Sequence, residues 1–414
     1  MDSRIVVIGA GMAGARLARR LGPACDVTLL GEEPHAPYNR VLLAEVLAGR
    51  YGPEVIALPP VPGGADTVRR GVRAVRIDRE ARTVHCADGS AVGYDRLVLA
   101  TGSNPVLPPL RGLDGGLPDG VHPFRTLDDC LALAALARRG TRAVVVGGGL
   151  LGVSASRALA ERGADVVLAH QGPTPMDRHL DPEAGGLVRR HLEDLGVEVH
   201  TECHARGLRH RDGTVTGVEL ADGFVLDADC VVLACGVRPR TGLAADAGLE
   251  VRQGVVVDDT LLTSDPRIHA IGDCAEHAGT VYGLATPALE QADVLAALLT
   301  SGGPEAPRCT GSGGPEAPRY TGTRALTRLT LSGSGTFDVA AFGQPSPRPG
   351  DDVVRLADAT RGAYRKVVVR GDRLVGGVLL GDLGTVGALA RAWEGDDPLP
   401  DAPLLHLLTT DGGL

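Results

Sequence analysis

Two stretches of the chain show the same order of hydrophobic and polar positions. Residues 4–9 (RIVVIG) form a short apolar, β-branched run that is typical of a buried parallel strand. A glycine turn, a helix from about Met12 to Leu21 and a second apolar run, DVTLLG, are expected to follow. The same order returns at 142–170, where RAVVVGG, a glycine turn, a helix to about Arg162 and ADVVLAH succeed one another. The repeated strand–glycine–helix–strand order predicts an α/β fold with two Rossmann-like dinucleotide-binding domains.

The segments outside these two units predict small antiparallel sheets. The stretch RTVHCADGSAVGYDRLVLA alternates in hydrophobicity between turn residues, which is typical of a β-meander. Residues 301–322 repeat SGGPEAPRCTG as SGGPEAPRYTG, and their Gly and Pro content predicts a flexible linker. Beyond it, 323–381 predicts several strands, including the hairpin YRKVVVRGDRLVGGVLLGD, and GTVGALARAWEG predicts a short closing helix. The end of the chain is therefore expected to form a small α+β domain.

These patterns divide the chain into five predicted parts. The first nucleotide-binding domain is expected at 1–112 and again at 239–298, with the second inserted at 113–238. The linker is expected at 299–319 and the C-terminal α+β domain at 320–414.

Composition narrows the class of protein. The hydrophobic content of 43% and the mixed charges indicate a soluble globular chain, and the net charge of −9 argues against a nucleic-acid partner. No apolar run reaches the roughly 18 residues of a membrane span. The eight cysteines contain no CxxC pair, so no metal site is expected, and reduced thiols suggest a cytoplasmic location. The chain has a single lysine, Lys366.

The first glycine loop, GAGMAG, has the spacing of a dinucleotide-binding turn. Gly9 allows the tight turn, Gly11 lets the backbone approach a pyrophosphate, and Gly14 lets helix and strand pack closely. Glu32 follows Gly14 by 18 residues, at the end of the second strand, where a carboxylate can accept hydrogen bonds from ribose hydroxyls. The alternative is an ordinary glycine turn with a surface acid.

The second loop, GGGLLG, contains Gly147, Gly149 and Gly152, but its second strand ends in His170 rather than in an acid. A neutral imidazole there can bond a 2′-hydroxyl, and a charged one tolerates a 2′-phosphate. His170 can equally be a solvated strand-end residue. Because the nearest following arginine is Arg178, the choice between NADH and NADPH stays open.

Two later strand ends add to the pattern. YDRLVLATGSNP predicts a strand that ends in Ala100-Thr101-Gly102, and TSDPRIHAIGDCAEH predicts a strand that ends in Gly272-Asp273 before a helix start. At a helix N-terminus, Asp273 can accept a hydrogen bond from a ribityl hydroxyl while the helix faces a pyrophosphate. Each strand end alone is unremarkable, but together they favour a flavin-nucleotide site.

The order of these segments carries a family resemblance over residues 1–298. The segments are EEPHAPYNRVLLAEVLAG, LVLATGSNP, FRTLDD, GGGLLG, RHLDPEAG, LACGVRPRTGLA and TSDPRIHAIGDCAEHAGTVYGLATPALEQA. They resemble the pyridine nucleotide–disulfide oxidoreductase superfamily. Within it, the chain looks most like the flavin-reductase part of NAD(P)H nitrite reductases and like rubredoxin and ferredoxin reductases. The tail from Tyr320 more weakly resembles the small domain that follows the reductase core in that group.

The resemblance implies FAD on the first loop and NADH or NADPH on the second. The residues implied to contact FAD are Gly9, Ala10, Gly11, Ala13, Gly14, Glu32, Glu33, Arg40, Val75, Ala100, Thr101, Gly102, Arg125, Gly272 and Asp273, with Thr286 and Pro287, at a helix start, near the flavin ring. Those implied to line the nicotinamide-nucleotide site are Gly147, Gly149, Leu150, Leu151, His170 and Gly236.

Glu45 and Ser154 depart from the family pattern. The resemblance places Glu45 where the ferredoxin-reductase branch has a lysine near flavin N5, and Ser154 where that branch has the glutamate that pairs with it. A glutamate there would disfavour the anion of a reduced flavin, or, if buried, act as an acid. The alternatives are that Glu45 points to solvent and that Ser154 enlarges the nicotinamide pocket or only packs the helix.

The resulting hypothesis is an FAD-dependent NAD(P)H oxidoreductase that passes electrons to a redox partner of the nitrite reductase, rubredoxin or ferredoxin type. Two alternatives are a biosynthetic flavoenzyme that acts on a small, possibly nitrogen-containing metabolite, and a non-catalytic flavin-binding subunit. Disulfide-reductase chemistry is not expected, since no two cysteines have the required spacing and Cys274 is expected to be structural. The oligomeric state is not specified by the sequence.

Overall fold

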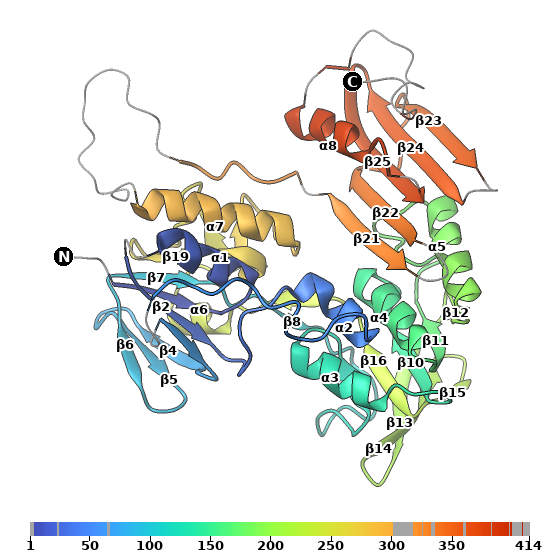
Figure 1. The fold of residues 1–414 in the computed structure, drawn as a ribbon, viewed down its shortest axis with the longest axis horizontal. Coiled ribbons are helices and arrows are strands. Elements are labelled where there is room, and N and C mark those ends of the chain that lie inside the picture. Colours follow the sequence, from blue (N-terminus) through green and yellow to red (C-terminus); the bar gives the residue numbers. More distant parts are fainter. Residues whose placement is uncertain are drawn as a thin grey trace. The chain divides into compact units, whose positions relative to one another are not determined.

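The computed structural model describes residues 4–22, 25–63, 67–300, 318–324, 326–332, 336–358, 362–381, 383–396, 398–399 and 408 (Figure 1). The chain forms two compact units. The first comprises Met1–Leu42, Gly52–Asn104 and Val237–Thr323, and the second Leu43–Tyr51, Pro105–Gly236 and Arg324–Leu414. The five domain boundaries drawn from the sequence stay predictions. Most of the expected linker and of the tandem repeat, residues 301–317, lies outside the described residues.

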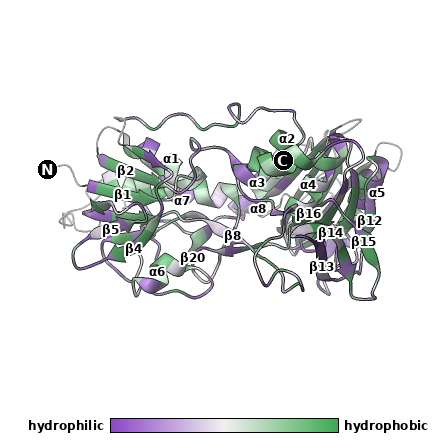
Figure 2. Cartoon of the chain, turned by 90° about the horizontal axis from the view of Figure 1, so that it is seen from below, coloured by the Kyte–Doolittle hydropathy of each residue, from purple (hydrophilic) through white to green (hydrophobic). Residues whose placement is uncertain are grey.

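A five-stranded parallel sheet forms the centre of the first unit. Its order is β19-β7-β1-β2-β3, and its strands are β1 (Arg4–Ile8), β2 (Asp26–Gly31), β3 (Val68–Arg70), β7 (Arg96–Leu99) and β19 (Ile268–Ala270). Four of the five residues of β1 are buried, and Figure 2 shows apolar residues running along β1 and β2. Burial on both faces explains why this strand is a continuous apolar run rather than an alternating one.

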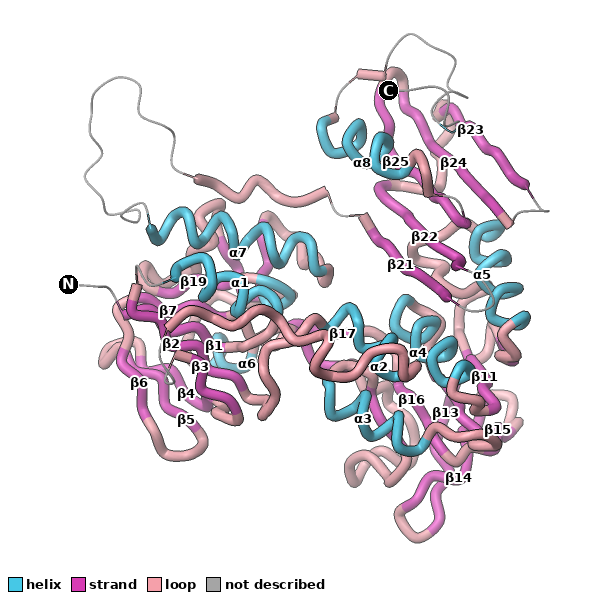
Figure 3. Tube along the Cα trace, viewed as in Figure 1, coloured by secondary structure: helices cyan, strands magenta, loops and turns pink. Residues whose placement is uncertain are grey.

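Helices α1 (Met12–Leu21) and α7 (Ala285–Thr300) pack against each other in the first unit (Figure 3). Leu17, Ala18 and Leu21 of α1 are buried in the same core as the sheet, and the helix predicted from Met12 to Leu21 is confirmed. Smaller elements complete the unit: the meander β4 (Ala74–Asp78), β5 (Thr83–Cys86) and β6 (Ala91–Gly93), the pairs β8 (Ser103–Pro105) with β17 (Val237–Pro239) and β18 (Val255–Val257) with β20 (Ala275–His277), the helix α6 (Gly242–Asp246) and the 3-10 turns η2 (Arg40–Leu42) and η3 (Gly272–Cys274).

The second unit contains a parallel sheet built in the same way. Its order is β12-β11-β10-β16-β9, with β9 (Val121–Pro123), β10 (Arg142–Val146), β11 (Asp165–Ala169), β12 (Glu198–His200) and β16 (Cys230–Leu233). Its helices are α2 (Leu43–Leu47), α3 (Leu127–Leu136), α4 (Leu150–Glu161) and α5 (Pro182–Asp194). A three-stranded antiparallel sheet of β13 (Ala205–Arg211), β14 (Thr214–Leu220) and β15 (Val225–Asp227) shares its core.

The last part of the second unit is an antiparallel sheet with one helix. The order is β21-β22-β25-β24-β23, formed by β21 (Thr327–Ser332), β22 (Thr336–Gly343), β23 (Asp352–Asp358), β24 (Ala363–Arg370) and β25 (Arg373–Gly381). Helix α8 (Val386–Gly395) packs Val386 and Leu389 into the core of this sheet. The hairpin and the closing helix predicted from the sequence are confirmed.

One predicted element is wrong. No helix begins after Gly272-Asp273: these residues form the short turn η3, and the chain continues directly into β20. The next helix, α7, begins at Ala285. Asp273 therefore does not lie at the N-terminus of an α-helix. Among the residues that the structure describes, no helix is both long and apolar enough to cross a bilayer.

Candidate functional site

The first glycine loop joins β1 to α1 and packs as its spacing predicts. Gly9 has φ +116°, and a Cβ on it would lie 2.1 Å from the carbonyl oxygen of Ala100. A Cβ on Gly14 would lie 2.0 Å from the carbonyl oxygen of Gly9. Both contacts are with backbone that cannot move aside, so these two glycines are fixed by packing.

Gly11 differs from its neighbours because the space beside it is open. A Cβ there would have Arg40 Nε as its nearest neighbour, at 3.9 Å. Gly11 is also the N-cap of α1, and it has no side chain to cap the first N–H groups, whereas Thr126 caps α3 by accepting a hydrogen bond from Asp129 N. An uncapped helix start beside open space fits a pyrophosphate.

The structure brings other predicted flavin-site residues to this loop. Ala100 N donates to Ile8 O, and Ser103 Oγ donates to Asp273 Oδ2 at 2.9 Å, so the end of β7 lies between the loop and η3. A Cβ on Gly272 would lie 3.3 Å from that of Ala13, which places η3 against α1. The side chain of Gln291, on α7, accepts from Gly272 N at 2.7 Å. Thr286 and Pro287 lie in the first turn of α7, as predicted.

The end of β2 is followed by two carboxylates that were also predicted, Glu32 and Glu33, and the predicted Arg40 on η2 contacts one of them. Glu32 forms an ion pair with Arg240, whose Nη1 lies 2.5 Å from Oε2. Glu33 accepts hydrogen bonds from Arg40 and from the hydroxyl of Tyr38, the latter at 2.6 Å. Because each carboxylate offers about four acceptor positions, both retain capacity for ribose hydroxyls.

The remaining predicted residues are more scattered. Ala10 packs its methyl group against Gly31 at the end of β2, and Thr101 donates to the carbonyl oxygen of Arg240 at 2.7 Å. Val75 is exposed on β4. Arg125 belongs to the second unit, where its N–H donates to Asp129 at 3.1 Å. The roles of these residues toward a flavin stay predictions.

The second glycine loop repeats the geometry of the first. A Cβ on Gly147 would lie 2.4 Å from Ala234 O, and one on Gly152 would lie 1.7 Å from Gly147 O. Beside Gly149, the N-cap of α4, and beside Gly236 a Cβ would meet no described atom within 4 Å. Leu150 and Leu151 form the first turn of α4. The second unit therefore holds another open, uncapped helix start that fits a dinucleotide.

His170 is buried, so the alternative in which it is a solvated strand-end residue is wrong, and its role at the nucleotide site stays a prediction. Its Nδ1 accepts a 3.1 Å hydrogen bond from Gly148 N, and its Nε2 lies 3.3 Å from Oδ1 of Asp177. The sequence contained no indication of Asp177 as a partner, because seven residues separate the two.

Glu45 belongs to a closed ring of four charged side chains in the second unit. Arg157 Nη2 lies 2.5 Å from Glu45 Oε1, and Arg157 Nη1 lies 3.1 Å from both oxygens of Glu161. Arg50 completes the ring, 2.8 Å from Glu161 and 3.4 Å from Glu45. The alternative in which Glu45 points to solvent is wrong, since its side chain is 18% exposed and Arg157 only 1%.

Ser154 lies one turn before Arg157 on α4, and its hydroxyl donates to Leu150 O at 2.8 Å. This bond stays within the helix, which supports the helix-packing alternative for Ser154. The carboxylate of Glu45 is held as an acceptor by two guanidinium groups, which does not favour a proton-donating role. The lysine–glutamate pattern of the family could not predict this ring, because its buried cation is Arg157, which follows Ser154 by one turn of α4.

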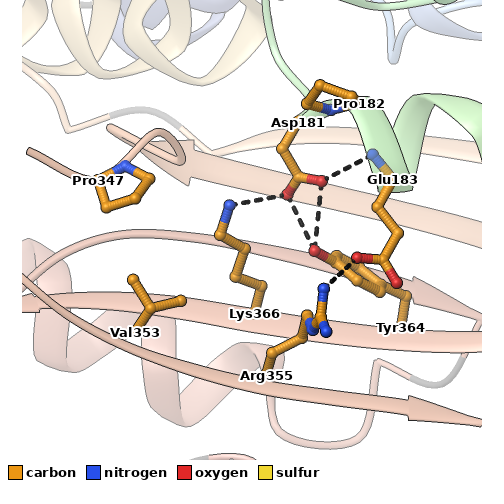
Figure 4. A pocket seen from close by; sticks show the side chains of 8 residues that line it. All are labelled: Asp181, Pro182, Glu183, Pro347, Val353, Arg355, Tyr364 and Lys366. Atoms are coloured by element: carbon orange, nitrogen blue, oxygen red, sulfur yellow. Dashed lines mark hydrogen bonds and ion pairs between the residues drawn. The ribbon is translucent and has the colours of Figure 1, made fainter.

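A separate pocket of about 460 Å³ lies in the second unit, between α5 and the C-terminal sheet (Figure 4). Asp181, the N-cap of α5, accepts from Tyr364 Oη and from Nζ of Lys366, each at 3.2 Å. Arg355 pairs with Glu183 at 2.5 Å. Each charged side chain in Figure 4 thus has a partner of opposite charge inside the pocket. These contacts fasten the sheet to α5.

The described cysteines are free thiols. Burial raises the pKa of Cys130 and of Cys230 to about 12, and that of Cys235 to about 11. Burial also raises the pKa of Cys274, whose thiol donates to Leu99 O at 3.4 Å. Such thiols are poor nucleophiles, in keeping with the structural role expected of Cys274. The cytoplasmic location suggested by the cysteines stays a prediction.

Two models of known protein families match this chain, one over most of both units and one over the C-terminal part of the second unit. The family model "Pyridine nucleotide-disulphide oxidoreductase" matches residues 3–292, and the model "Rubredoxin NAD+ reductase C-terminal domain" matches residues 327–394. The first description implies FAD and NAD(P)H as cofactors.

Two individual relatives and one solved structure are also similar to this chain. Nitrite reductase [NAD(P)H] of Bacillus subtilis (strain 168) is 36% identical over 92% of this chain, which spans only 46% of that relative. Rhodocoxin reductase of Rhodococcus erythropolis is 37% identical, over 72% of each protein. The ferredoxin reductase for the CYP199A2 system of Rhodopseudomonas palustris is 27% identical, with a TM-score of 0.83 over 99% of this chain and 98% of that one. These matches confirm the predicted fold class.

Proposed function

The chain belongs to the pyridine nucleotide-disulphide oxidoreductase family, as its motifs predicted, and from that premise we propose that it is an FAD-dependent NAD(P)H oxidoreductase that delivers electrons to a separate redox protein. FAD is assigned to the first unit and the nicotinamide nucleotide to the second. The acceptor is a protein of the nitrite reductase, rubredoxin or ferredoxin type.

One observation carries this proposal: the part of the chain that the structure describes contains two open glycine cradles. Gly11 and Gly149 occupy the same place in their units, each as the uncapped start of a helix that follows a central parallel strand. Around both, the neighbouring glycines are locked by packing while the middle one faces free space. A chain with a single cradle would bind one dinucleotide, and two cradles support a donor and a resident cofactor.

The residues of the first unit would hold the FAD. The N–H groups at the start of α1 would face its pyrophosphate, Glu32 its ribose, and Asp273 its ribityl chain. The bound flavin would accept a hydride and release electrons, which is chemistry that the protein side chains do not provide. The protein contributes binding, orientation and the charges around the cofactor.

The second unit would bind NADH or NADPH along the start of α4. Gly147, Gly149 and the first turn of the helix support the pyrophosphate, and Gly236 leaves room beside it. Glu45 and Ser154 stay candidates for the region near the reacting rings. We assign them positioning roles, because Glu45 is tied to Arg157 and Ser154 to its own helix.

The choice of acceptor rests on the relatives. This chain spans about half the length of two nitrite reductases that it matches, but 72% of the rhodocoxin reductase, whose name gives rhodocoxin as the protein that it reduces. The tail matches a domain named for rubredoxin reductases. These likenesses favour a one-electron protein acceptor over a small metabolite.

The test is a cofactor and electron-transfer assay on the purified full chain. The visible spectrum and mass spectrometry of the released cofactor should identify FAD. Adding NADH or NADPH without oxygen should bleach the flavin, and ferricyanide or a ferredoxin should restore its colour. Reoxidation by a small metabolite alone would refute the proposed acceptor. A folded protein that takes up no flavin would refute the whole proposal.

A further inference from the structure

The end of β11 differs from the equivalent place in the first unit. Gly9 N donates to Leu30 O, and Gly147 N donates to Ala169 O. In strand register, therefore, His170 corresponds to Gly31 of the first unit and Gln171 to Glu32. The position that carries an acid in the first unit carries a neutral amide in the second.

Asp177, seven residues after His170 in the chain, brings a carboxylate back to the end of β11. Met176 N donates to Gly148 O at 2.8 Å, which ties the segment before Asp177 to the glycine loop. The Asp177 carboxylate then lies 3.3 Å from Nε2 of His170, with its side chain 31% exposed. An acid thus lies beside the glycine loop at the end of β11, where dinucleotide-binding sites form hydrogen bonds to the ribose hydroxyls.

His170 holds Asp177 and is itself held in one tautomer. Because Gly148 N–H donates to Nδ1, the proton of the neutral ring lies on Nε2 and points to Asp177. The ring packs tightly against Gly148, where a Cβ would lie 2.7 Å from His170 Cγ. Gly172 is equally constrained, since its Cβ would lie 2.2 Å from Asp177 Oδ2. Two glycines therefore make room for the His170–Asp177 pair.

We propose that Asp177, positioned by His170, makes the second site select NADH over NADPH. A carboxylate accepts hydrogen bonds from the 2′- and 3′-hydroxyls of NADH, and it repels the 2′-phosphate of NADPH. A second proton on His170, which would offset this repulsion, would break the bond to Gly148 N. The inference rests on the proposed function, because it assumes that the second cradle binds a nicotinamide nucleotide.

Arg178 is the cation that argues for the opposite selectivity. It is exposed and follows Asp177 directly in the chain. A 2′-phosphate bound by Arg178 would make the protein prefer NADPH. The two possibilities predict different responses to removal of each charge, so a pair of variants separates them.

The experiment measures equilibrium binding of NAD+ and NADP+ to the full-length, flavin-loaded protein by isothermal titration calorimetry. Oxidised nucleotides avoid turnover. The wild type should bind NAD+ at least tenfold more tightly than NADP+. Asp177→Asn should reduce that ratio about tenfold, mainly by strengthening NADP+ binding. The matched control is Asp165→Asn, which removes the same charge at the opposite end of β11 and should leave the ratio unchanged.

Further variants test the role of His170. His170→Gln keeps a side-chain N–H toward Asp177 and should retain most of the preference, whereas His170→Leu should reduce it. NADP+ binding as tight as that of NAD+, or an unchanged ratio in Asp177→Asn, would overturn the inference. Loss of NADP+ binding in Arg178→Gln would also overturn it.

Failure of the proposed function would look different. The wild type would then bind neither nucleotide, or binding would be unaffected by Gly149→Ala, which fills the cradle.

Discussion

Nη2 of Arg157 lies 2.5 Å from Oε1 of Glu45, and this ion pair joins α4, which begins at the second glycine loop, to the short helix α2. Arg157 is among the largest fully buried side chains of the described residues. A buried guanidinium is costly unless carboxylates pair with it, and here Glu45 and Glu161 pair with its two terminal nitrogens. The pair thus fixes the helix that carries the proposed nucleotide site.

Arg157→Met should destabilise the protein by about 3 kcal/mol, because two partly buried carboxylates lose a partner. The free energy of unfolding, measured by urea denaturation, checks this. The control is Arg189→Met, which removes an exposed i,i+4 pair with Glu193 and should cost less than about 0.5 kcal/mol. Equal effects of the two substitutions would show that the Glu45 ring contributes no more than a surface pair.

Asp181→Ala should destabilise the protein by about 4 kcal/mol, since it removes the cap of α5 and leaves the buried Lys366 without its carboxylate. Asp181→Asn keeps the capping oxygen and should cost about half as much. Glu183→Gln breaks only the exposed pair with Arg355 and should cost under about 1 kcal/mol. Thermal or urea unfolding of the three variants gives the comparison, and an equal loss in all three would contradict the ranking.

His269 makes the stability of the protein depend on pH. It is buried on β19, and burial lowers the pKa of its imidazole to about 4. Below pH 6.5 the unfolded chain takes up a proton that the folded one refuses until about pH 4, so stability falls as the pH falls through this window. Between pH 7 and pH 5 the loss from this group is about 2 kcal/mol. His269→Leu should remove that share, and an unchanged difference between the two pH values would refute the assignment.

Local patterns in the sequence were enough to predict the two nucleotide-binding folds. The helix expected from Met12 to Leu21 has those bounds, and the apolar runs at 4–9 and 142–148 are central parallel strands. Glycine spacing predicted which backbone atoms approach closely, since Gly9 and Gly14 meet carbonyl oxygens. These features depend on neighbours within one βαβ unit, which a short window of sequence contains.

Contacts between distant segments could not be predicted in this way. Arg157 meets Glu45 across 112 residues, and Lys366 meets Asp181 across 185. The prediction of a helix after Gly272-Asp273 was wrong because the residues that follow pair with β18 and form the strand β20. In each case the partner is set by the packing of elements and not by the local sequence.

The most direct test of two separate cradles is a pair of substitutions, Gly11→Ala and Gly149→Ala. Both positions have φ near −75° and room for a methyl group, so neither change should disturb the fold. We predict that Gly11→Ala weakens FAD binding at least tenfold and leaves NAD+ binding intact, and that Gly149→Ala does the reverse. Gly186→Ala, in the middle of α5, should affect neither. Loss of both ligands in each variant, or of neither, would contradict the assignment of one dinucleotide to each unit.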